Sequence, residues 1–239
     1  MIIDVITTFP ETLNAFREMG IVGRAFETGL AELKCWDIRD FADDTYKHID
    51  DVPYGGGAGM IIKPDPLFRA FEAIETFRKD VGHRIFLTPQ GKPFVHNDAQ
   101  RLIETPHVVI LCGRYKGIDQ RVRDELIDEE ISLGDFVLSG GEIAAFAVID
   151  AMVRLLPGAV SDDESTKSDT FPVGLLDAPY YTRPAEYRGL TVPAVLLSGH
   201  HAQIDNWREQ QRLELTKAKR PDLFDRYMRG LEESNEQSK

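Results

Sequence analysis

Three short segments rich in glycine and proline could form a small-molecule site. They are TPQG at 88–91, GRYKG at 113–117 and GDFVLSGG at 134–141. Each follows an apolar run that predicts a β-strand, at 84–87, 107–111 and 130–133. Glycine lets the backbone adopt positive φ or approach a ligand closely, so the three segments could bind one ligand through backbone groups. The alternative is that turns between strands and helices simply require these residues.

A fourth glycine cluster, PYGGGAGM, occupies 53–60. It lacks the Gly-Lys-Ser/Thr sequence of a phosphate-binding P-loop and the GxGxxG spacing of a dinucleotide site. Its spacing alone therefore leaves two interpretations open, a plain turn or a ligand loop.

Two charged features could contribute acid–base or electrostatic chemistry. Arg154 interrupts the apolar run 143–156, and four carboxylates lie in SDDESTKSDT at 161–170. A carboxylate can act as a general base, and a fixed cation can stabilise developing negative charge. The simpler interpretations are an ion pair of Arg154 with Asp150, four residues earlier, and a solvated acidic linker.

The elements that would position these residues alternate between strand and helix patterns. This alternation predicts an α/β domain with a mainly parallel sheet, in which ligands bind beyond the carboxyl ends of the strands. The run 143–156 predicts a helix that is apolar nearly all round, so a core or a subunit interface must bury most of it. We expect three parts, namely a domain at 1–160, a linker at 161–170 and a smaller domain at 171–239.

The charge is distributed unevenly along the chain. The net charge of −12 argues against broad, nonspecific binding to nucleic acid. Residues 183–229, however, carry nine Arg or Lys against six Asp or Glu. A helix starting near Gln203 would place Ile204 and Trp207 on one face, with Arg208 and Arg212 off it, as suits packing on one side and phosphate contact on the other. This pattern favours a selective RNA partner, and 232–239 is expected to be disordered.

The cysteines and the N-terminus indicate a cytoplasmic protein. Cys35 and Cys112 lie in apolar contexts, with no CxxC and no His/Cys cluster at metal-ligand spacing. We predict two reduced thiols and no metal site built from them. The N-terminal sequence MIIDVITTFP has no basic region or cleavage site, and no uncharged apolar run approaches the ~20 residues that span a bilayer.

Six ordered motifs give the chain a specific resemblance. They are PYGGGAGM (53–60), LTPQGKPF (87–94), LCGRYKGID (111–119), SLGDFVLSGGE (132–142), SDTFPVGLLDAPYYTRP (168–184) and GLTVPAVLLSGHH (189–201). Over essentially its whole length the chain resembles the bacterial tRNA (guanine-37-N1)-methyltransferase (TrmD) family, of the SPOUT class. The resemblance implies a trefoil-knotted α/β domain, a small, mostly helical C-terminal domain that binds tRNA, and a homodimer with each active site at the interface.

The resemblance also implies the reaction and its residues. The methyl donor would be S-adenosyl-L-methionine and the acceptor N1 of guanosine 37 in the tRNA anticodon loop. Asp169 would be the general base, and Arg154 the cation that stabilises charge on O6 of the guanine. The residues implied for donor binding are Phe86, Leu87, Thr88, Pro89, Gln90, Gly113, Tyr115, Ser132, Leu133, Gly134, Asp135, Phe136, Val137, Leu138, Gly140 and Gly141. Those implied for tRNA binding are Gly59, Ser165, Arg183 and Arg208.

The sequence departs from the family pattern at three positions. Lys116 stands where glutamate is expected, and Phe86 and Phe136 stand where tyrosine is common. The resemblance implies that Mg²⁺ assists the methyl transfer, and a lysine at 116 puts that assistance in doubt. Two alternatives are another SPOUT-class RNA methyltransferase, acting for example on a ribose 2′-hydroxyl, and a noncatalytic RNA-binding relative. Asp169 and the SGHH sequence at 198–201 argue against the first, and Asp169 with Arg154 against the second.

Overall fold

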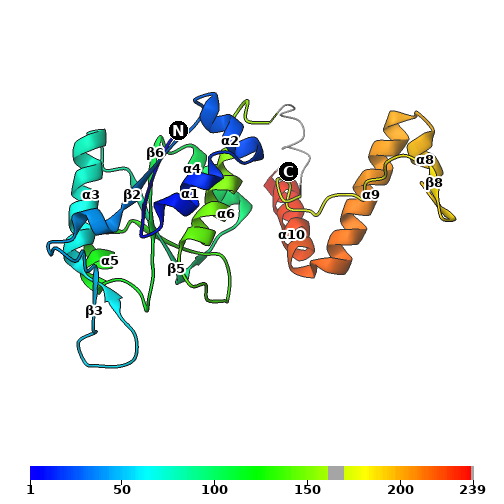
Figure 1. Cartoon of the computed structure of the whole chain (residues 1–239). Helices are drawn as coiled ribbons and strands as arrows, with labels where there is room; N and C mark the ends of the chain where they lie inside the picture. The colour runs from blue at the N-terminus through cyan, green and yellow to red at the C-terminus, as the bar shows by residue number, and fades with distance from the viewer. Residues whose placement is uncertain (161–169, 238–239) are drawn as a thin grey trace. The chain divides into compact units, whose positions relative to one another are not determined.

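The computed structural model describes residues 1–160 and 170–237. The chain forms two compact units, Met1–Ser161 and Asp162–Lys239. The first unit is an α/β domain, and the second is mostly helical (Figure 1).

A five-stranded parallel sheet forms the centre of the first unit. Its strands, in spatial order, are β2 (Glu32–Asp37), β1 (Ile2–Thr7), β6 (His107–Cys112), β5 (His83–Pro93) and β7 (Glu129–Ser132). The parallel α/β architecture predicted from the alternating pattern is therefore confirmed. The trefoil knot stays a prediction.

Helices cover both faces of this sheet. The helices of the first unit are α1 (Pro10–Phe16), α2 (Gly20–Glu27), α3 (Pro64–Arg78), α4 (His96–Ile103), α5 (Gln120–Leu126) and α6 (Glu142–Val153), with the 3₁₀ helix η1 (Ile38–Phe41). In β6, Val108 and Ile110 pack toward α1, α2, α4 and α6, whereas Val109 and Leu111 pack toward α3, α5 and η1. This two-residue period is what a strand buried on both faces requires, because successive side chains point to opposite sides.

Strand β5 differs from its prediction in a way that affects the site. The sequence predicts that a strand ends at Leu87 and that a turn follows, but β5 continues through TPQG to Pro93. Its register against β7 shifts between Leu87 and Lys92, which both pair with Ile131. Gly91 lies so close to β7 that an added Cβ would be 2.5 Å from the backbone nitrogen of Ile131. The glycine therefore permits a close crossing of two backbones inside a strand, which composition alone cannot distinguish from a turn.

Helix α6 is shorter and more exposed than its apolar sequence predicts. It ends at Val153, after which the N–H groups of Leu155 and Leu156 donate to carbonyls three residues back, and Pro157 follows. One face packs in the core through residues such as Val148 and Ile149, with no exposed surface. The opposite face is open in this chain, since 56% of Ile143 is exposed.

Within residues 170–237, the second unit has a short hairpin and three helices. These elements are β8 (Glu186–Tyr187), β9 (Leu190–Thr191), α8 (Ala194–Leu197), α9 (His201–Lys219) and α10 (Pro221–Gln237). The expectation of disorder was wrong for 232–237, because α10 continues to Gln237, and 238–239 lie outside the described residues. Because α10 packs against α9, the helix has a nucleus from which each further residue is added at little cost. Arg212 was predicted to face away from the packed side of α9, but it is half-buried and donates from Nε toward the carbonyl of Leu176 at 3.5 Å.

Candidate functional site

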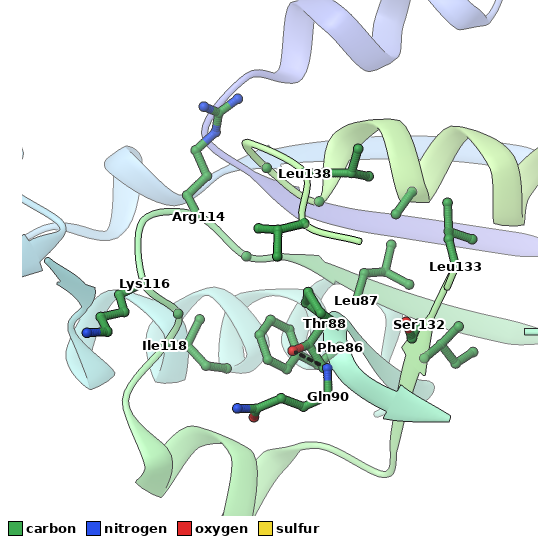
Figure 2. A pocket seen from close by; sticks show the side chains of 18 of the residues that line it. Phe86, Leu87, Thr88, Gln90, Arg114, Lys116, Ile118, Ser132, Leu133 and Leu138 are labelled. Carbon is green, nitrogen blue, oxygen red and sulfur yellow. Dashed lines mark hydrogen bonds between the residues drawn. The ribbon is translucent and has the colours of Figure 1, made fainter. Parts of the chain in front are cut away.

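A pocket of about 430 Å³ lies at the carboxyl ends of β5, β6 and β7 (Figure 2). All three segments singled out in the sequence, 88–91, 113–117 and 134–141, contribute to its wall. The lining residues are Ile61, Phe86, Leu87, Thr88, Pro89, Gln90, Gly113, Arg114, Tyr115, Lys116, Gly117, Ile118, Arg123, Ile131, Ser132, Leu133, Gly134, Phe136, Val137, Leu138, Ser139, Gly140, Gly141 and Ala144. The parallel sheet explains this convergence, because the carboxyl ends of its strands share one edge.

Of the residues expected to bind a donor, only Asp135 lies outside this lining. Its side chain is exposed, while its neighbours Gly134 and Phe136 line the pocket. A local turn leads into segment 134–141. In this turn Ser132 Oγ accepts a hydrogen bond from the N–H of Gly134 at 3.1 Å and donates one to the carbonyl of Gly134 at 3.1 Å. Gly134 itself adopts φ +149°, where other residues are strained.

The bulged part of β5 supplies the polar wall of the pocket. Thr88 Oγ1 accepts a hydrogen bond from the N–H of Gln90 at 3.3 Å (Figure 2). The side-chain oxygen of Gln90 accepts from Arg123 at 2.7 Å, and Arg123 donates from Nε to Glu130 at 2.7 Å. The hydrogen bond to Glu130 is the main cause of a raised pKa of Arg123. An amide fixed in this way can present its N–H₂ group to a ligand.

The segment 113–117 packs directly against this wall. A Cβ at position 113 would lie 2.8 Å from the ring of Phe86, so glycine is needed there for close packing. Tyr115 adopts φ +57° and is 55% exposed, and burial of part of the ring is the main cause of the raised pKa of its hydroxyl. Lys116 is exposed, and its side chain points away from Phe86 and Gln90 (Figure 2).

The glycine cluster at 53–60 lies beside segment 113–117. It joins β3 (Asp50–Asp51) to β4 (Ile61–Ile62), which pair antiparallel. The N–H of Lys116 donates to the carbonyl of Met60 at 3.0 Å, and the N–H of Ile62 donates to the carbonyl of Gly117 at 3.0 Å. A Cβ on Gly59 would lie 3.6 Å from Cβ of Lys116. Of the two interpretations of this cluster, its position beside the pocket favours a ligand loop.

The remaining predicted residues lie apart from the pocket lining or outside the described residues. Arg154 is half-buried where α6 ends, and its N–H donates to the carbonyl of Asp150 at 3.1 Å. Asp169 and Ser165 lie outside the described residues. In the second unit, Arg183 is exposed, and Arg208 is exposed with Asp205 Oδ1 at 3.8 Å from its guanidinium.

Sequence reasoning missed several residues at the pocket. Arg114 lies inside a motif that was recognised, so its position offered a signal that was not used. Arg123 and Glu130 gave no such signal, because only the packing of α5 beside β5 brings Arg123 to Gln90. Glu142 ends the recognised motif 132–142 and was given no role, yet its side chain is 5% exposed and contacts Thr7 and Arg114.

The two cysteines are free thiols, as predicted. Burial raises the pKa of Cys35 to about 11 and that of Cys112 well above its ordinary value. A raised pKa disfavours the thiolate, which is the reactive form of cysteine. No group of three or more His, Cys, Asp or Glu side chains in 1–160 or 170–237 is placed to hold a metal ion. None of the helices in the described part of the chain has the length and apolar character needed to cross a membrane.

The chain matches a described protein family and several curated proteins. The family model described as tRNA (Guanine-1)-methyltransferase TrmD covers residues 1–226. A tRNA (guanine-N(1)-)-methyltransferase of Burkholderia ambifaria is 50% identical over 230 residues, which are 95% of this chain and 87% of the relative. The protein of the same name from Ralstonia nicotianae is 52% identical over 223 residues, 93% of this chain and 85% of the relative. From its fold, its pocket and these matches, the chain belongs to the tRNA (guanine-1)-methyltransferase TrmD family.

Proposed function

We propose that this protein transfers a methyl group from S-adenosyl-L-methionine to N1 of guanosine 37 in the anticodon loop of tRNA. The observation that carries the proposal is the pocket formed by three segments at the carboxyl ends of β5, β6 and β7, in a chain that matches the family over 1–226. Membership of the family supports the reaction type, and the names of the relatives support guanine N1 of tRNA as the acceptor.

The pocket suits a methyl donor of this size and chemistry. A volume of about 430 Å³ falls in the range of roughly 300–1,000 Å³ found for small-molecule sites. Phe86, Leu87 and Leu138 offer apolar surface to an adenosine group, and the glycines of 134–141 expose backbone donors and acceptors. S-adenosylmethionine, when bound, supplies a methyl group activated by a sulfonium. The phenylalanines at 86 and 136 suit a site that reads adenine through its backbone, since no hydroxyl is needed there.

Methyl transfer to guanine requires a base at N1 and a cation near O6. N1 carries a weakly acidic proton, and a positioned base that removes it is typically worth ~10²–10⁴-fold in rate. We assign that role to Asp169. As the proton leaves, negative charge develops on O6, and Arg154 is the cation assigned to stabilise it. Arg154 lies at the carboxyl end of α6, where the negative end of the helix dipole attracts a cation.

The second unit is the proposed tRNA-binding domain. Its segment 183–229 carries an excess of basic residues, in contrast to the acidic remainder of the chain. Arg183 and Arg208 are exposed and available to phosphates, and Gly59 and Ser165 are the proposed contacts from the other parts of the chain. If this assignment is right, tRNA affinity falls steeply with salt while donor affinity hardly changes. A salt-independent tRNA affinity would contradict it.

A homodimer would cover the open face of α6. Ile143 is 56% exposed, and Met19 and Ile21, near α1 and α2 that pack on α6, are 59% and 41% exposed. Exposed apolar side chains of this size that gather on neighbouring helices mark an interaction surface. Sedimentation is expected to show a dimer at assay concentrations, and an active monomer would contradict this. The cytoplasm is the proposed location, and two free thiols suit its reducing conditions.

One assay tests the function directly. Purified protein is incubated with labelled S-adenosylmethionine and unmodified tRNA that carries G37, and the digested product is analysed for 1-methylguanosine. A matched tRNA with adenosine at position 37 serves as the control and is expected to remain unlabelled. Label on a ribose hydroxyl would instead identify another RNA methyltransferase, and no label at all would indicate a noncatalytic relative.

A further inference from the structure

A buried chain of polar contacts joins three elements behind the pocket. Thr7, the last residue of β1, donates from its hydroxyl to Glu142 Oε1 at 2.8 Å. Glu142, the first residue of α6, accepts at Oε2 from the NH2 group of Arg114 at 3.3 Å. The N–H of Phe9 donates to Thr7 Oγ1 at 3.0 Å. Thr7 and Glu142 are 135 residues apart in sequence, so only the fold brings them together.

The glycines of the pocket wall leave the space for this chain of contacts. An added Cβ at Gly140 would collide with Glu142 Oε2 and lie 3.0 Å from the guanidinium of Arg114. Gly140 also forms a backbone bridge with Arg114, antiparallel to it. Gly140 does not have a positive φ. Glycine is therefore required at this position by the space that the ion pair occupies, and not by the backbone conformation.

The ion pair is held from both ends. Glu142 is 4% exposed and is surrounded by polar partners, namely Arg114, Thr7 and the positive end of α6. The guanidinium of Arg114 lies over the ring of Phe9, 4.0 Å from its centroid. The Nε–H group of Arg114 is buried and has no acceptor among the described residues. Glu142 is therefore the principal polar partner of the Arg114 side chain. The side chain leaves segment 113–117 on the side opposite to Phe86 and Gln90 (Figure 2).

We propose that Glu142 and Arg114 are positioning residues that hold segments 113–117 and 134–141 at the separation required by the methyl donor. The proposal rests on the proposed function. Both segments supply pocket wall, and the ion pair connects them. Arg114 itself lines the pocket, whereas Glu142 does not. Loss of the pair lets the segments separate, so that the pocket loses its fit to the donor. Chemistry at guanine N1 is affected only through donor binding.

The test uses conservative variants and a binding measurement besides activity. Glu142→Gln keeps the shape of the side chain and removes the charge that anchors Arg114. Thr7→Val removes only the hydroxyl, and Thr7→Ser restores it. Glu129→Gln is the matched control, because Glu129 also pairs with an arginine, Arg101, at 2.6 Å, but does not line the pocket.

Calorimetry with S-adenosylhomocysteine as the probe is expected to show at least ~10-fold weaker binding for Glu142→Gln and a smaller loss for Thr7→Val. Thr7→Ser and Glu129→Gln are expected to bind as the wild type does. In steady-state assays the KM for the donor rises, while kcat at saturating donor and the KM for tRNA change little.

Wild-type affinity for the probe in both Glu142→Gln and Thr7→Val would overturn the proposal. If Glu142→Gln does not fold, Thr7→Val against Thr7→Ser decides the question alone, with equal affinities overturning it. A failure of the proposed function is distinguishable, because the wild-type protein itself would then neither bind the probe nor methylate tRNA.

Discussion

The backbone N–H of Gly141 donates to the carbonyl oxygen of Gly113 at 2.9 Å, which joins the end of β6 to the start of α6. A Cβ at position 141 would lie 2.7 Å from Cα of Cys112 and 3.0 Å from the nitrogen of Gly113. Gly141 has φ −77°, so the requirement for glycine here is space and not backbone conformation. The contact brings together two segments that line the pocket.

Gly141→Ala is therefore expected to lower the free energy of unfolding by about 1–3 kcal/mol, because the backbone must shift to admit the methyl group. It also weakens S-adenosylhomocysteine binding. Urea denaturation and calorimetry measure the two effects. Gly230→Ala is the control, since a Cβ there meets nothing within 4 Å in α10, and alanine should stabilise that helix by roughly 0.5–1 kcal/mol. Equal behaviour of the two variants would show that the close contact has no energetic role.

Asp169→Asn is expected to bind S-adenosylmethionine normally and to lose methyl transfer by at least ~10²-fold, because the general base is removed while the pocket stays intact. Single-turnover assays measure the chemical step. Asp163→Asn, in the same acidic run, is the matched control and should keep its rate. Near-normal turnover of Asp169→Asn would assign the base to another residue.

Arg154→Ala is expected to slow the chemical step and also to weaken tRNA binding, since one cation would face both the substrate and the charge that develops on O6. The rate at saturating tRNA and the dissociation constant of tRNA are measured separately. Arg101→Ala removes an arginine paired with Glu129 and serves as the control. An unchanged rate at saturating tRNA would indicate that Arg154 has only a structural role.

Lys116 bears on the requirement for Mg²⁺. The side chain is exposed at the edge of the pocket, where a carboxylate could bind the metal directly or through water, and an ammonium repels it. We expect the wild type to keep more activity in EDTA than Lys116→Glu does, and Lys116→Glu to depend more strongly on Mg²⁺. Lys92→Glu, an exposed charge reversal outside the pocket lining, controls for net charge. Equal silencing by EDTA, with rescue at the same Mg²⁺ concentration, would remove Lys116 from the metal step.

The ionisation of Asp80 makes the stability of the protein depend on pH. This residue lies at the end of the sheet opposite to the pocket. His107 is buried, and its two ring nitrogens lie 2.9 Å from Asp80 Oδ2 and 2.9 Å from the fully buried Asp4 Oδ2. The hydrogen bond from His107 is the main cause that holds the pKa of Asp80 below its ordinary value. Because the folded-state pKa is lowered, the contribution is fully present above the unfolded pKa of about 4 and is lost as the pH falls through the folded value.

The stability of the wild type is therefore expected to fall more steeply than that of Asp80→Asn when the pH drops below about 4. The effect is small, since 56% of the Asp80 side chain is exposed and solvent screens the pair. Thermal denaturation as a function of pH measures it, with Asp43→Asn, which removes an exposed pair with Arg69, as the control. Parallel pH profiles for wild type and Asp80→Asn would exclude a role for this contact.

Local patterns in the sequence were sufficient to predict the parallel sheet and the approximate position of the pocket. The strand predicted at 107–111 is β6, and its alternation of core faces follows from the two-residue period of a β-strand. Parallel strands with glycine-bearing ends must open at one edge, so the convergence of three segments could be predicted without coordinates. The sequence likewise sufficed to predict two free thiols, because nothing in the spacing of Cys35 and Cys112 favoured a disulfide bond.

Only the tertiary structure decided which side chains meet. Gly91 lies inside a strand and not in a turn, because β7 passes close to it. Arg123 reaches Gln90 from a helix 33 residues later, and Glu142 reaches Thr7 across 135 residues. Such contacts depend on how helices pack on the sheet, and no local period in the sequence encodes a pairing between distant residues. The sequence by itself determined that a ligand site lies at the carboxyl edge of the sheet, and the packing of α5 and α6 decided which polar residues support it.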